Sequence, residues 1–132
     1  MQLGFVSAIL PEQTFDRTFQ IASEIGYDCV EVCCWPAGKA ERRYAGVSHI
    51  DVAHMTEHVV SEIRKTIDAT GVLISALGYY PNPLSPVSGE AEAAVAHLHV
   101  VIEVRTDWVW PMSTRSSAAT GRCRSMTTGR DF

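Results

Sequence analysis

Three short apolar runs in the chain are separated by segments whose apolar residues recur with the spacing of a helix. The runs cover residues 3–9, 29–34 and 72–77. Continuous apolar runs of this length are typical of strands that are buried on both faces of a sheet. The second run also contains two β-branched residues, Val30 and Val32, which favour strands. The pattern therefore predicts three buried strands.

Three helices are predicted between and after these strands. Thr14 and Thr56 are suited to cap the first two helices at their N-termini, and Gly26 and Gly71 are suited to end them. Ser88 begins the third helix. The apolar residues expected to face the core are Phe15, Phe19, Ala22 and Ile25 in the first helix, Val59, Val60, Ile63 and Ile67 in the second, and Ala91, Val95, Leu98 and Ile102 in the third.

The order of these elements predicts the fold class. Three strands that alternate with three helices require a parallel sheet with helical crossovers, because parallel neighbours cannot be joined by a tight turn. The crossovers are expected to be right-handed. A chain of 132 residues is long enough for one domain with one core. We therefore predict an α/β domain over residues 1–104, followed by an irregular tail over residues 105–132.

Composition and charge exclude several classes of protein. Hydrophobic residues make up 46% and charged residues 20% of the chain, and the net charge of −4 argues against a basic nucleic-acid-binding face. No stretch approaches the roughly 20 apolar residues of a membrane span. The N-terminus lacks the basic leader of a signal peptide. We expect a cytoplasmic protein that binds neither nucleic acid nor membranes.

The cysteines fit a reducing compartment. Cys29, Cys33 and Cys34 cluster in the second predicted strand, and Cys123 stands apart. The stronger interpretation is that they are small apolar residues of a buried strand. A zinc site at Cys29 and Cys33, completed by Cys123 or a histidine, is the alternative. We assign no metal ligand in this chain.

Glu31 and His49 are candidate site residues of different kinds. Glu31 lies between two valines of the second strand, and a buried carboxylate costs several kcal/mol unless it is paired. It is expected to have a lysine or arginine partner or to approach a substrate pocket. His49 is either a structural histidine or a group that hydrogen-bonds substrate and transfers protons near neutral pH. The other histidines are expected at the surface: His54, His58, His97 and His99.

A long connection over residues 35–55 holds further candidates. Loops of this length are usually functional or disordered. Lys39, Arg42 and Arg43 are suited to bind a phosphate or a sugar oxyanion, and solvated loop charges are the alternative. Trp35 either contacts a sugar ring or packs at the rim of the domain.

The segment after the third strand is rigid, because each of its prolines fixes its own φ angle and restrains the residue before it. Tyr80 in this segment either stacks on a sugar or packs at the rim. Asn82 is a further candidate for contact with substrate.

Residues 105–132 differ from the rest of the chain. They contain five arginines and no lysine, and their apolar residues follow no period, which is typical of a disordered tail or a weak nucleic-acid arm. The genetic code allows a third interpretation. When each triplet of the coding sequence is started at the third base of the preceding codon, residues 107–109 must give Leu-Gly. In the same frame residues 113–120 permit a sequence that begins Val-Asn-Thr-Phe-Val, which would form a fourth strand. We hypothesise that the tail is an out-of-frame translation of a longer α/β protein, which the coding DNA would test.

Four segments carry a resemblance to a known family. They are LGFVSAILPE, EIGYDCVEVCCWP, KAERRYAGVSHIDV and SALGYYPNPL. Through them the chain resembles the xylose-isomerase-like TIM-barrel family of sugar phosphate isomerases and epimerases. The resemblance implies the first three βα units of a (β/α)8 barrel, whose full length is about 250 residues. It also implies a small sugar or sugar phosphate as ligand.

The resemblance also implies chemistry that lies beyond this chain. Full-length members hold a divalent metal (Mn, Mg, Co or Zn) with carboxylates and a histidine of later strands, and two glutamates move the proton next to a carbonyl. We therefore expect a fragment that keeps part of the substrate pocket and is inactive alone. One alternative is a noncatalytic small α/β binding module. Another is a DNA repair enzyme that resembles the apurinic endonucleases of the same superfamily.

Overall fold

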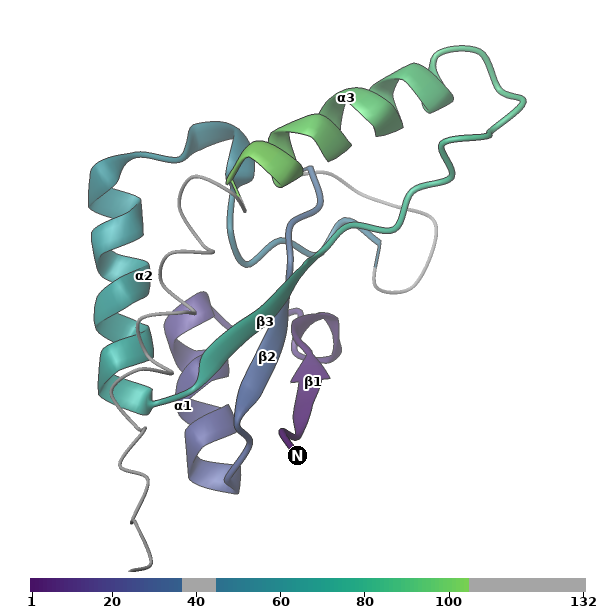
Figure 1. The fold of residues 1–132 in the computed structure, drawn as a ribbon. Helices are drawn as coiled ribbons and strands as arrows, with labels where there is room; N and C mark the ends of the chain where they lie inside the picture. The colour runs from purple at the N-terminus through teal and green to yellow at the C-terminus, as the bar shows by residue number, and fades with distance from the viewer. Residues whose placement is uncertain (37–44, 105–132) are drawn as a thin grey trace, which may run out of the picture.

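The computed structural model of the protein describes residues 1–36 and 45–104, which form one parallel sheet with helices around it (Figure 1). Its strands are β1 (Gly4–Val6), β2 (Cys29–Cys33) and β3 (Leu73–Gly78), in the order β1-β2-β3. Both pairings are parallel. The predicted α/β class with three parallel strands is confirmed.

The first two helices begin and end where the sequence predicts. They are α1 (Phe15–Ile25) and α2 (Glu57–Thr70). The Oγ1 atoms of Thr14 and Thr56 each accept a hydrogen bond of 3.3 Å from a backbone N–H in the first turn, which satisfies a group that would otherwise lack a partner. Gly26 and Gly71 end the helices with φ angles of 94° and 70°, which glycine adopts without steric cost.

The hydrophobic core lies between the sheet and the α1 and α2 helices, which lie side by side on one face of the sheet (Figure 1). Phe19 is fully buried at its centre, together with Val30 and Val32 of β2. The prediction that Ile25 faces this core is wrong, because its side chain is 65% exposed. Ile25 is the last residue of α1, and Tyr27 fills the space beyond the helix by packing on Phe5.

The first predicted strand is shorter than expected. Residues 7–9 form the 3-10 helix η1 (Ser7–Ile9), because the Ser7 side chain turns inward and accepts a hydrogen bond of 2.9 Å from the backbone N–H of Cys33. A second short helix, η2 (Val52–His54), lies within the connection that precedes α2, and Asp51 caps it. Neither helix has a periodic apolar pattern that the sequence could reveal.

The third helix, α3 (Glu90–Val104), lies across the carboxyl ends of the strands and projects away from the sheet (Figure 1). Its buried residues are Ala94, Val101 and Val104, and it packs on η2. Two residues of the predicted core face, Val95 and Ile102, are exposed, while Ala91 and Leu98 are partly buried. Apolar residues occur nearly all round this helix, so helical period alone does not select the buried face.

Within the described ranges, none of the helices combines the length and the apolar character needed to cross a membrane.

Candidate functional site

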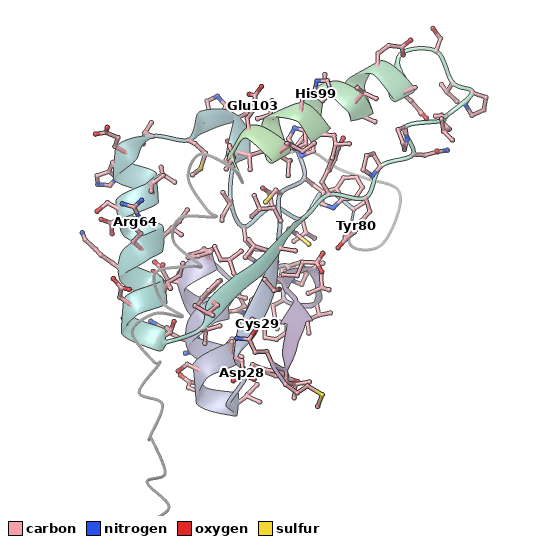
Figure 2. The ribbon with its side chains drawn as sticks, viewed as in Figure 1. Asp28, Cys29, Arg64, Tyr80, His99 and Glu103 are labelled. Atoms are coloured by element: carbon pink, nitrogen blue, oxygen red, sulfur yellow. The ribbon has the colours of Figure 1, made fainter. Side chains whose placement is uncertain are left out.

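The carboxyl ends of the three strands form the edge at which parallel sheets usually place their functional groups. Ser7 follows β1, Glu31 is the middle residue of β2, and Tyr80 follows β3. In Figure 2, Tyr80 lies beyond one end of β3, while Asp28 and Cys29 lie at the opposite end of the sheet. The structure therefore brings two of the predicted site residues, Glu31 and Tyr80, to this edge.

Glu31 and Tyr80 meet at Gly78, and we call these three residues the Glu31 site. A Cβ atom on Gly78 would lie 2.9 Å from Glu31 Oε1 and 3.5 Å from the Tyr80 hydroxyl. The glycine thus gives the carboxylate and the phenol access to the same small volume. A side chain at this position would have to displace Glu31.

The carboxylate of Glu31 is partly buried, and one of its oxygens has no donor among the described residues. Its Oε1 atom is inaccessible to solvent, and no hydrogen-bond donor meets it among the residues that the structure describes. The predicted lysine or arginine partner is therefore not found in these residues. Beside it, the Tyr80 side chain is 60% exposed. A buried acceptor without a donor, next to an accessible aromatic side chain, is the arrangement expected where a ligand supplies the donor.

His49 lies in a closed hydrogen-bond network next to this site. Its Nδ1 atom is 3.1 Å from Ser7 Oγ, and its Nε2 atom is 3.2 Å from the carbonyl oxygen of Leu10. Its backbone N–H donates to the carbonyl of Cys33 over 2.9 Å. Ser7 is fully buried, and both ring nitrogens of His49 already have protein partners, so the pair offers a substrate no unengaged donor or acceptor. This geometry supports the structural interpretation of His49.

Trp35 belongs to an aromatic cluster that includes a residue from the middle of α3. Its ring meets Tyr79 edge to face with centroids 4.9 Å apart, and Tyr79 meets His97 in the same way at 4.5 Å. His97 Nε2 lies 2.7 Å from the carbonyl oxygen of Cys34. The ring contact with Tyr79 therefore favours the interpretation that Trp35 packs at the rim of the domain. His97, predicted at the surface, is only partly exposed, and its ring joins α3 to the chain just after β2.

The described cysteines are free thiols without the character of reactive groups. Burial raises the pKa of the Cys34 thiol to about 12. Burial also raises the pKa of Cys33, against the opposing effect of the Ser7 hydroxyl. A thiol that stays protonated at neutral pH is a poor nucleophile and a poor metal ligand. The interpretation of these residues as buried apolar side chains fits their environment.

A divalent metal has no ligand set in the part of the chain that the structure describes. Three or more His, Cys, Asp or Glu side chains do not converge anywhere in residues 1–36 and 45–104. Glu31 is a single carboxylate, which is not enough for any of the four metals that the family resemblance implies. No role of a metal is assigned to these residues.

The remaining predicted residues divide into two groups. Asn82 is exposed, and its side-chain oxygen accepts a hydrogen bond of 3.1 Å from the backbone N–H of Leu84, so it stabilises a turn. Lys39, Arg42 and Arg43 lie outside the described residues, as does the tail of residues 105–132.

Sequence reasoning missed Gly78, which completes the Glu31 site, and Ser7, which bonds to His49. Only Ser7 had a signal in the sequence. The available signal was a hydroxyl within an apolar run, the same kind of signal that identified Glu31.

Comparison with known proteins adds no identity. No family model, no curated protein and no solved structure matches the chain. The functional argument therefore depends on the residues of the Glu31 site.

Proposed function

We propose that the chain forms the first three βα units of a sugar isomerase or epimerase barrel and holds part of its sugar-binding site. The order β1-β2-β3 with parallel pairing is compatible with the opening strands of a (β/α)8 barrel. The observation that carries the proposal is the buried Oε1 atom of Glu31, which has no donor among the described residues and adjoins Tyr80. A sugar hydroxyl would supply the hydrogen-bond donor that Glu31 Oε1 does not have among the described residues.

The chemistry of the Glu31 site suits a neutral, hydroxyl-rich ligand. An ionised carboxylate accepts strong, short hydrogen bonds from hydroxyl donors, and these bonds are stronger where water is excluded. The phenol of Tyr80 provides a second polar contact and an apolar ring surface. Gly78 places no side chain between the carboxylate and the Tyr80 hydroxyl.

The proposed role is binding without turnover. Metal-assisted proton transfer next to a carbonyl is the reaction we propose for the full barrel. The described residues offer a carboxylate and a phenol for binding but no converging ligand set for a metal. The free thiols among these residues also agree with the cytoplasmic location that we propose.

A second candidate function is that of a noncatalytic binding module. The observation that favours it is the continuous core between the sheet, α1 and α2, which the described residues form with each other. A domain with its own core can fold alone and bind a partner without being part of a barrel. This module would unfold cooperatively as a monodisperse protein, whereas barrel units that lack their neighbours would associate. Size-exclusion chromatography and a thermal melt distinguish the two.

The sugar-binding proposal is tested by titrating the protein with unphosphorylated and phosphorylated aldoses and ketoses, followed by NMR chemical shifts. Resonances of Gly78 and Tyr80 are expected to shift. Glu31→Gln should weaken binding by about tenfold or more, since a hydrogen bond to a charged group contributes about 1.5–3 kcal/mol. Tyr80→Phe should weaken it less.

Two variants serve as matched controls. Glu24→Gln changes an exposed carboxylate of α1, and Tyr27→Phe removes a phenol at the opposite end of the sheet. Both should bind as the unchanged protein does. The proposal is wrong if no sugar shifts the Gly78 and Tyr80 resonances, or if Glu31→Gln and Glu24→Gln bind equally well.

A further inference from the structure

The hydrogen bonds of His49 determine which of its ring nitrogens carries the proton. The carbonyl oxygen of Leu10 can only accept, so Nε2 of His49 must donate to it. Nδ1 of the neutral ring is then an acceptor, and the Ser7 hydroxyl donates to it. The oxygen of Ser7 in turn accepts from the backbone N–H of Cys33. Each donor meets an acceptor only while the imidazole is neutral.

Protonation of the ring disrupts this arrangement. Nδ1 would become a second donor facing the Ser7 oxygen, and the Ser7 proton would have to turn to the thiol of Cys33, a weak acceptor that also contacts this hydroxyl. Burial lowers the pKa of His49, although the backbone carbonyls of Leu10 and Gln13 act in the opposite direction. The folded protein therefore resists the imidazolium form.

The charged groups around His49 are already engaged with other partners. A depression of about 240 Å³ beside the ring is also lined by Asp16 of α1, Asp51 of the loop, and His58 and Glu62 of α2. The three carboxylates hydrogen-bond to the side chains of Thr66, His54 and Lys65, respectively. Hydrogen bonds do not cancel the charge of a carboxylate, so these groups still act against the effect of burial, which is the largest cause acting on the pKa of His49 and lowers it.

We propose that His49 is a pH-operated latch for the loop of residues 45–50. The neutral ring holds this loop against η1 and β2, and the imidazolium releases it. The backbone contacts of the loop with the end of β2 depend on this position: His49 N–H bonds to Cys33, and Trp35 N–H lies 3.4 Å from the carbonyl of Val47. The latch does not depend on the proposed sugar site.

The direction of the pH effect follows from proton linkage. The released loop binds a proton at the ordinary histidine pKa of about 6.5, and the latched form binds it only at lower pH. The latch is therefore fully closed above about pH 6.5 and weakens as the pH falls toward the lowered pKa. Each unit by which the pKa is lowered corresponds to about a tenfold change in the ratio of latched to released protein.

Amide hydrogen exchange measured by NMR at pH 7.5 and pH 5, corrected for intrinsic rates, tests the latch. The amides of residue 49 and Trp35 should lose protection at pH 5 relative to the Val60 amide of α2, by about tenfold for each unit of pKa lowering. In His49→Gln, whose amide group can still donate to Leu10, this difference should disappear. His58→Gln changes a histidine that lines the same depression, and it should keep the pH dependence.

Two results would overturn the latch. One is an equal loss of protection in His49→Gln and in the unchanged protein. The other is full protection of the loop at a pH where the ring resonances show His49 to be protonated. Ser7→Ala gives an independent measurement if His49→Gln does not fold. It removes the hydroxyl that donates to Nδ1, so the pKa of His49 should rise, and an unchanged pKa would contradict the proposal.

Discussion

Replacing Glu31 by glutamine should make the ligand-free protein more stable. The Oε1 atom of Glu31 is buried without a donor among the described residues, so the folded state bears a desolvation cost that the unfolded chain does not. A buried unsatisfied group costs about 1–3 kcal/mol. Because one of the two oxygens is affected, we expect the lower end of this range. Glu31→Gln keeps the shape and leaves a neutral amide, whose burial costs less than that of a charge, for a gain of about 1 kcal/mol.

Urea unfolding at pH 7, followed by circular dichroism, measures this gain. With a slope of about 2 kcal/mol per molar urea, the midpoint should rise by roughly 0.5 M at an unchanged slope. Glu24→Gln is the control, because Glu24 is exposed and pairs with Arg17 at 3.0 Å, a contact that contributes at most about 1 kcal/mol. It should lower the midpoint slightly or leave it unchanged. If Glu31→Gln is destabilising instead, the carboxylate has a structural partner and the argument for a ligand there is refuted.

Three further predictions concern the core, β1 and the thiols. Phe19→Ala should destabilise the fold by about 3–5 kcal/mol and Ile25→Ala by less than about 0.5 kcal/mol in the same urea assay, since the first side chain is fully buried and the second is exposed. Gly4→Ala should cost about 1–3 kcal/mol, because its Cβ atom would clash with the carbonyl of Cys29 and separate β1 from β2; an unchanged midpoint would contradict this close approach. Cys34 should resist iodoacetamide at pH 8 until the protein is unfolded, as mass spectrometry would show, because a pKa of about 12 leaves very little thiolate.

The ends of α1 and α2 could be predicted from the sequence because their signals are local. A threonine that caps the first turn and a glycine that ends the last turn act through neighbouring residues alone. The limits of β1 could not be predicted in this way. Ser7 leaves the strand because its hydroxyl bonds to Cys33, a residue distant in the sequence. The residues that neighbour Ser7 in the sequence therefore do not predict this hydrogen bond.

The buried face of α3 could not be predicted for a different reason. Its sequence predicts a helix correctly, but apolar residues lie nearly all round it. The buried face is therefore chosen by what the helix meets, which is η2 and, through the ring of its own His97, the carbonyl oxygen of Cys34 just after β2. Because η2 arises from the irregular connection before α2, no period within α3 could identify Val101 and Val104 as buried.

Glu31 and His49 show how a structure separates functional from structural polar residues that a sequence presents alike. Both lie near the carboxyl end of β2, and both are polar groups in largely apolar surroundings. His49 has a partner for each ring nitrogen, and the hydroxyl beside it is fully buried. Glu31 has an oxygen without a described donor and an exposed tyrosine beside it. A ligand can improve the hydrogen bonding of Glu31 but only disturb that of His49, so binding should be sought at Glu31 and conformational control at His49.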